Sequence, residues 1–146
     1  NLVTSASLTS YSTEYAAIQG NGNLSSRIES ITINGGLVYS VYNQAIYAPQ
    51  TGTMNITGGE IKGTTALYVK SGNVNISGGK FIATGGYKNY VYNGNGTATN
   101  GDALVIDSCG YPGGYPVVTI TGGTFNGGVA FGGGNKIEKL LTNLRE

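Results

Sequence analysis

The sequence predicts an all-β protein, a right-handed parallel β-helix of about five to six coils, from two recurring motifs and their spacing. The first motif appears as ITINGGL at 31–37, MNITGGEI at 54–61, VNISGGKF at 74–81 and VTITGGTF at 118–125. The second appears as AIYA at 45–48, ALYV at 66–69 and ALVI at 103–106, with weaker copies AAIQ at 16–19 and VAF at 129–131. The two motifs alternate along the chain, so one repeat contains two or three short strands joined by turns.

The spacing of the first motif is that of a solenoid. The isoleucine before each glycine pair stands at Ile33, Ile56, Ile76 and Ile120, which gives spacings of 23, 20 and 44 residues. The last spacing is either two ordinary turns or one turn that carries insertions. A β-propeller is the competing architecture, but its blades need about 40 or more residues of antiparallel strand.

The alternation within the motif indicates which side chains face the interior. Val74 and Ile76 share one face of a strand, because neighbouring side chains point to opposite faces. The following Gly-Gly pair lets the backbone turn a corner that a β-carbon would obstruct. Stacked coils then form two internal ladders, one of Ile33, Ile56, Ile76 and Ile120, the other of Leu37, Ile61, Phe81 and Phe125. The right-handed sense follows from the general rule for parallel crossovers.

The chain divides into a β-helix over 1–134 and a short helix over 135–146. Ile137, Leu140, Leu141 and Leu144 follow the spacing of one helical face. We expect this helix to cap the last coil, with a connector to a following domain or an oligomerisation helix as the alternatives.

Composition favours an extracellular or cell-surface protein. The formal net charge is +1, only 10% of residues are charged, and Gly reaches 26 and Tyr 11. A net charge this close to zero does not provide the basic surface that nucleic-acid binding requires. The sequence has no apolar run of about 18 residues, so membrane insertion is not expected. Cys109 is the only cysteine, so no intrachain disulfide forms. Because the chain starts at Asn1 without a signal-like segment, we expect a piece of a larger secreted chain with further domains as partners.

Two insertions, at 84–102 and 107–116, interrupt the minimal coil, and we expect them to emerge near each other on one side. Loops on a rigid scaffold often carry function. Tyrosine rings offer flat apolar faces to sugars, and Asn and Asp can hydrogen-bond hydroxyl groups. The expected carbohydrate-binding residues are Tyr87, Tyr90, Tyr92, Asn93, Asp102, Asp107, Tyr111 and Tyr115. The alternatives are a protein contact patch, where tyrosine is also enriched, and simple packing of the insertions against the solenoid.

The residues argue against catalysis and metal chemistry, so no catalytic residue and no metal site is predicted. Asp102 and Asp107 would lie about 17 Å apart along one strand, whereas glycosidase carboxylates lie about 5 to 9.5 Å apart. The chain has no histidine, which removes a Ser/His/Asp site and, with one cysteine, a zinc site. No cofactor is expected beyond a structural calcium ion, for which NGNGTATNGD at 93–102 is the only candidate segment.

The motifs NISGGKF and TITGGTF and the run GDALVIDSCGYPGGYP resemble the GGTF-type β-helix repeats of large surface proteins from Gram-positive gut bacteria. The resemblance covers about residues 30 to 128 and implies an adhesin-like, carbohydrate-binding role. The expected function is therefore a non-catalytic segment that binds glycan or host surface through its Tyr/Asn-rich loops. The alternatives are a structural spacer in a larger surface protein, and a fragment of a polysaccharide-degrading enzyme or of a phage tail fibre or tailspike.

Overall fold

The computed structural model describes residues 2–23, 29–86, 101–108 and 110–132, and all regular structure in these ranges is β-strand. The strands are β1 (Leu2–Thr4), β2 (Ser7–Ser10), β3 (Ile18–Gln19), β4 (Glu29–Ser40), β5 (Ile46–Ala48), β6 (Gly52–Gly63), β7 (Leu67–Val69), β8 (Asn73–Ile76), β9 (Lys80–Ala83), β10 (Asp102–Asp107), β11 (Val117–Ile120), β12 (Thr124–Asn126) and β13 (Gly128–Gly132). The helix predicted over 135–146 lies outside the described residues.

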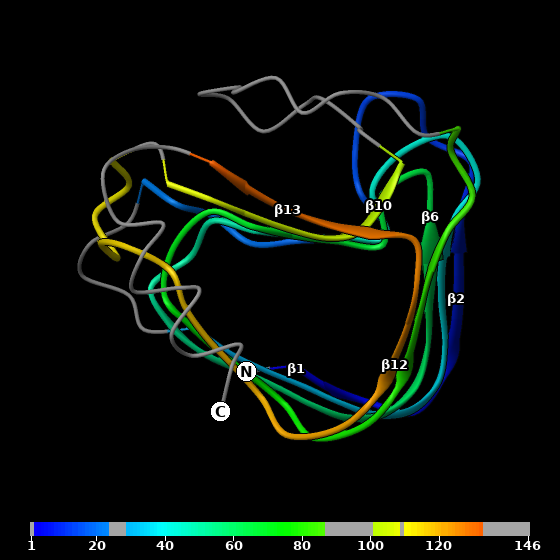
Figure 1. Cartoon of the computed structure of the whole chain (residues 1–146), viewed down its shortest axis with the longest axis horizontal. Coiled ribbons are helices and arrows are strands. Elements are labelled where there is room, and N and C mark those ends of the chain that lie inside the picture. The colour runs from blue at the N-terminus through cyan, green and yellow to red at the C-terminus, as the bar shows by residue number, and fades with distance from the viewer. Residues whose placement is uncertain (1, 24–28, 87–100, 109, 133–146) are drawn as a thin grey trace.

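The strands form two sheets in which the pairings are parallel. Sheet 1 has eight strands in two arms: β1, β4, β6, β8 and β11 form the first arm, and β2, β4, β6, β9 and β12 the second. The long strands β4 and β6 run through both arms, so the sheet bends where they bend. Sheet 2 has five strands in the order β3, β5, β7, β10 and β13. Viewed end on, the two arms and sheet 2 lie on three sides of one interior (Figure 1).

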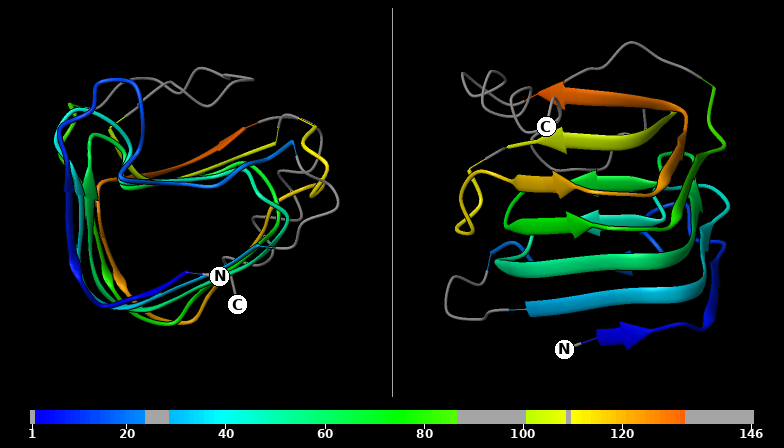
Figure 2. Two further views of the ribbon diagram at one scale, coloured as in Figure 1. Left: turned by 180° about the vertical axis from the view of Figure 1, so that it is seen from behind. Right: turned by 60° about the horizontal axis from the view of Figure 1, so that its bottom comes forward.

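Five successive segments, here called repeats, each add one layer to this stack. Repeat 1 contains β1 to β3, repeat 2 β4 and β5, repeat 3 β6 and β7, repeat 4 β8 to β10, and repeat 5 β11 to β13. Figure 2 shows the layers lying side by side in chain order. The pairing of β8 directly with β11 resolves the 44-residue spacing, because Ile76 faces Ile120 with no layer between them. That spacing is one repeat carrying insertions.

The core is a set of apolar ladders on the inner faces. The predicted ladder Ile33, Ile56, Ile76 and Ile120 is confirmed by the strand registers. The second ladder was predicted wrongly at one position, because Leu37 pairs with Glu60 whereas Val38 pairs with Ile61 and is fully buried. Each repeat places its next core residue five positions after the motif isoleucine, and Leu37 falls one residue short of that point. Phe81 and Phe125 close the ladder with stacked rings 4.8 Å apart.

The second glycine of each motif makes the bend between the arms of sheet 1. Gly36, Gly59, Gly79 and Gly123 all have positive φ angles, between 74° and 98°. A β-carbon at Gly59 would also approach the Gly35 carbonyl oxygen to 2.7 Å. The corner predicted from the Gly-Gly pair is therefore confirmed, and two constraints impose it, backbone conformation and the close approach of the preceding layer.

Candidate functional site: a buried polar cluster and a tyrosine corner

The structure separates the residues predicted to bind sugar. Tyr87, Tyr90, Tyr92 and Asn93 lie outside the described residues, as does the candidate calcium segment except for its last two residues. Asp102 and Asp107 begin and end β10, and both are buried, at 3% and 0% exposed. The insertions at 84–102 and 107–116 therefore join the stack at opposite ends of this strand, and the expectation that they leave it near each other is wrong.

The loop after β10 carries the two remaining predicted tyrosines, and both are held against the body of the protein. Tyr115 is partly buried and packs on the main core, which agrees with the packing alternative for this residue. The Tyr111 hydroxyl lies 3.0 Å from the Tyr47 hydroxyl, in hydrogen-bonding contact. The loop is tied down further by Ser71, whose hydroxyl donates to the Gly114 carbonyl at 3.1 Å.

Beneath this loop, the outer face of sheet 2 holds a buried polar cluster. Lys70 Nζ donates to Asp107 Oδ2 at 2.9 Å, and both side chains are fully buried. The Tyr68 hydroxyl donates to the same Oδ2, also at 2.9 Å. Asp107 Oδ1 has no hydrogen-bond partner among the described residues. One carboxylate oxygen thus accepts both donors while the other remains buried and unsatisfied, an arrangement that is expensive in free energy.

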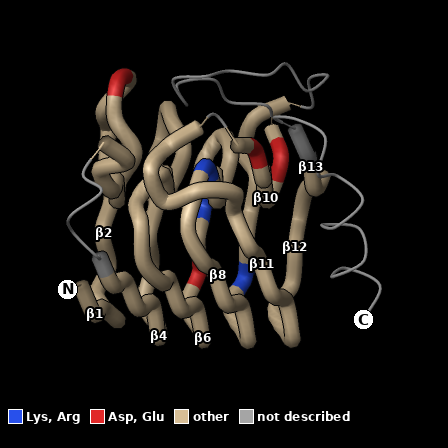
Figure 3. Tube along the Cα trace, turned by 90° about the vertical axis from the view of Figure 1, so that its left-hand side faces the viewer, with Lys and Arg blue, Asp and Glu red and all other residues tan. Residues whose placement is uncertain are grey.

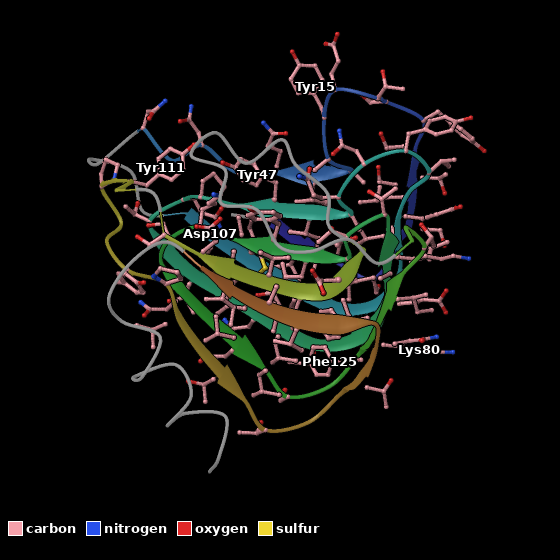
Figure 4. All side chains as sticks on the ribbon, turned by 45° about the horizontal axis from the view of Figure 1, so that its top comes forward. Tyr15, Tyr47, Lys80, Asp107, Tyr111 and Phe125 are labelled. Atoms are coloured by element: carbon pink, nitrogen blue, oxygen red, sulfur yellow. The ribbon has the colours of Figure 1, made fainter. Side chains whose placement is uncertain are left out.

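Aromatic contacts extend this cluster toward the surface. Tyr68 and Tyr47 occupy neighbouring outward positions on β7 and β5, with ring centroids 6.1 Å apart in an edge-to-face arrangement. Tyr47 then contacts Tyr111, which is half-buried. Figure 4 shows Tyr111 and Tyr47 side by side, with Asp107 nearby. A series of contacting side chains therefore runs from the buried ion pair through Tyr68 and Tyr47 to Tyr111.

A second feature is a group of solvent-exposed tyrosines on one corner of the stack. The three most exposed aromatic side chains of the described residues are those of Tyr11, Tyr15 and Tyr42. Their exposed fractions are 72%, 59% and 58%. Tyr11 and Tyr15 lie in the loop between β2 and β3, and Tyr42 lies in the matching loop between β4 and β5. We call these three residues the tyrosine corner. Figure 4 shows Tyr15 projecting away from the body.

Hydrogen bonds hold the loops of this corner in place. The Ser12 hydroxyl accepts from the Tyr15 backbone N–H at 3.0 Å, and the Asn43 side chain donates to the Thr13 carbonyl at 3.2 Å. The corner also continues through the later layers, since Thr64 N–H donates to Asn43 O and Gly85 N–H donates to Thr64 O. The insertion at 84–102 thus leaves the stack from the same edge that carries the tyrosine corner.

Charge and metal chemistry are sparse in the described residues. Figure 3 shows a stack that is largely uncharged along its length. No group of three or more His, Cys, Asp or Glu in the described ranges could hold a metal ion. Burial raises the pKa of Asp102 above its usual range, but its nearest acidic neighbour along the strand, Asp107, lies at the opposite end of β10. The described ranges also contain no helix long and apolar enough to cross a membrane.

Sequence reasoning missed the most important residues of both features. Tyr47, Tyr68 and Lys70 lie in or beside the strand motifs AIYA and ALYVK, where alternation places them on the outer face and predicts solvation. The available sequence signal is that Lys70 and Asp107 occupy the same position, directly after the fourth residue, in two copies of the second motif, ALYVK and ALVID. Sequence reasoning also missed Tyr11, Tyr15 and Tyr42, because they lie in short loops that no motif or insertion marks. Comparisons with protein-family models, curated proteins and solved structures found no match to this chain.

Proposed function

We propose that this chain is a non-catalytic, right-handed parallel β-helix segment of a secreted or cell-surface adhesin-like protein, and that it binds neutral glycans through the tyrosine corner. The β-helix is supported by the parallel pairing of each motif copy with the next, through five repeats and two sheets. The adhesin-like assignment rests on the GGTF-type motifs and on the low charge of the chain.

The observation that carries the binding proposal is the exposure of three tyrosines on adjacent layers of one rigid edge. An exposed aromatic ring loses hydration when a sugar ring stacks on it, and its hydroxyl group hydrogen-bonds sugar hydroxyls. The corner loops are fixed by side-chain to backbone hydrogen bonds, so little conformational entropy is lost on binding. Glu14 is the only charged residue of the two corner loops, at 11–17 and 41–45, and its negative charge favours a neutral ligand over an acidic polysaccharide.

The insertion that contains the predicted loop residues begins at the same edge of the stack. The insertion at 84–102, which contains Tyr87, Tyr90, Tyr92 and Asn93, departs from the edge that bears Tyr42. We propose that this insertion extends the glycan-binding surface beyond repeats 1 and 2. Tyr115, by contrast, is assigned to packing because it contacts the main core.

A glycan array tests the proposal. The wild-type chain is compared with the triple variant Tyr11→Ala, Tyr15→Ala, Tyr42→Ala and with a control, Val3→Ala, Val117→Ala. The control also removes exposed apolar side chains, 65% and 42% exposed, but from the first arm of sheet 1. We expect the wild type and the control to bind the same glycans and the triple variant to lose them. Equal binding by all three chains would contradict the assignment of the site.

A structural spacer is the second candidate function, and the burial of Tyr47, Tyr68 and Tyr115 favours it. These tyrosines contribute packing rather than binding surface, as expected for a module that only holds other domains apart. A chain that acts only as a spacer would fold but would bind no glycan on the array. Absence of binding by a folded wild-type chain therefore selects the spacer.

A further inference from the structure

Lys70 and Asp107 meet in a geometry that an ordinary surface ion pair does not have. Val69 of β7 lies opposite Ile106 of β10 in a parallel pair, so the next residue of each strand points to the same outer face. The two side chains are 0% exposed, and the Nζ atom lies 2.9 Å from Oδ2. The amine nitrogen and the carboxyl group are therefore held in contact in a site without access to bulk water.

The surroundings favour a neutral product over two buried charges. Asp107 Oδ1 is buried without a hydrogen-bond partner among the described residues, and an unsatisfied charged oxygen is costly. Tyr68 places its hydroxyl 2.9 Å from Oδ2, and its ring lies 5.0 Å from Lys70 Nζ. The Tyr68 phenol thus contacts Oδ2, the oxygen that must leave Cγ when the Lys70 amine replaces it.

We propose that Lys70 and Asp107 are joined by an intramolecular amide bond. Proton transfer across the 2.9 Å contact converts the pair into an amine and a carboxylic acid, which are the reacting forms. The Nζ lone pair attacks Cγ, the Nζ–Cγ bond forms, and the Cγ–Oδ2 bond breaks. The Tyr68 hydroxyl protonates the departing Oδ2 and regains a proton from Nζ, so that one water molecule leaves and no oxidant or reductant is consumed. Burial favours the release of that water.

The bond would join repeat 3 to repeat 4 and close the chain around the insertion at 84–102. Lys70 and Asp107 are 37 positions apart, and that insertion lies between them. A covalent link of this kind restricts the unfolded chain in the way a disulfide does, without the second cysteine that this sequence lacks. The inference concerns the scaffold and does not rest on glycan binding.

Intact-mass spectrometry of the denatured wild-type chain tests the inference directly. We expect a mass lower than that of the sequence by one water, about 18 Da. Proteolysis should release a branched peptide that joins the segment containing Lys70 to the segment containing Asp107 and that reducing agents leave intact. The full sequence mass in a chain whose circular dichroism shows folded β-structure would overturn the proposal.

A succinimide at Asp107 would also remove one water, so the peptide map decides between the two. A succinimide gives a linear peptide that hydrolyses in mild alkali, and finding it in place of the branched peptide would equally overturn the proposal. Lys70→Arg keeps the charge but should restore the full sequence mass, whereas Lys62→Arg, at a half-buried lysine on β6, should keep the loss of water. In chains produced unfolded and then folded for the first time, Tyr68→Phe should slow the appearance of the lighter species, and an unchanged rate would remove Tyr68 from the reaction.

Discussion

Ile76 and Ile120 lie directly opposite each other in the parallel pair of β8 and β11, although 44 residues of chain separate them. The neighbouring pair of Phe81 and Phe125 keeps the same register on β9 and β12. The insertions at 84–102 and 107–116 therefore leave the register of the core ladders unchanged. The chain can carry a long loop at each end of β10 without disturbing the stack, because lengthening a loop adds only a small entropic cost.

Phe81 should be the most costly core residue to truncate. It is fully buried and stacks on Phe125 with an interplanar angle of 8°. Phe81→Ala should lower the free energy of unfolding by about 3–5 kcal/mol, because it leaves a cavity. Phe125→Ala is the matched control and should have a smaller effect, because Phe125 is only partly buried. Urea denaturation measures both, and equal losses would contradict the placement of the core.

The corner glycines should be intolerant of a side chain. Gly59 has a φ of +89°, and a β-carbon there would approach the Gly35 carbonyl oxygen. Gly59→Ala should therefore reduce stability by about 1–3 kcal/mol. At Gly86 an added β-carbon meets no atom of the described residues within 4 Å, so Gly86→Ala should leave the melting temperature nearly unchanged. Similar losses in the two variants would argue against the bend between the arms.

The buried pair of Lys70 and Asp107 should show strong coupling. Lys70→Met removes the proposed amide bond and leaves the Asp107 carboxylate buried without its lysine partner, so it should lower the free energy of unfolding by about 3–5 kcal/mol. The double variant Lys70→Met, Asp107→Leu removes that buried carboxylate as well and should be more stable than Lys70→Met alone. Thermal or urea unfolding of the four chains completes the cycle. Additive losses would show that the two side chains do not interact.

Asp102 should make the protein less stable as pH rises. Burial raises its pKa in the folded state above the unfolded value of 3.8. The contribution of this group is thus fully present below pH 3.8 and is lost as pH rises through the folded pKa, because the folded state binds the proton more tightly. Asp102→Asn should remove that loss. Melting temperatures measured from acidic to neutral pH test this, and parallel curves for the two chains would contradict it.

Much of the fold could be predicted from the sequence because each layer repeats the same physical pattern. Ile33, Ile56, Ile76 and Ile120 alternate with polar residues and precede a glycine pair, so strand, inner face and corner all follow from local rules. Leu37 was misplaced because an outward apolar residue beside Val38 is indistinguishable from an inward one until the register is known. The polar residues of the motif also stack, since the Asn75 side-chain amide donates to Asn55 Oδ1 of the preceding layer at 3.1 Å.

The candidate site was less predictable because it depends on contacts between distant segments. Loop composition points to Asp107 and Tyr111, but their partners Lys70, just after β7, and Tyr47, in β5, are 37 and 64 positions away. Alternation assigns those partners to an outer face, and outer faces are normally solvated. Their burial cannot be derived from one strand at a time. The exposed Tyr11, Tyr15 and Tyr42 come from two loops, and only the stacking of those loops brings the three residues to one corner.

Nuclear magnetic resonance of tyrosine-labelled protein, titrated with an oligosaccharide selected from the array, tests the central claim most directly. We expect the ring resonances of Tyr11, Tyr15 and Tyr42 to shift together with one dissociation constant, while those of buried Tyr68 stay in place. Shifts confined to other tyrosines, or none with any glycan that the chain is offered, would contradict glycan binding at the tyrosine corner.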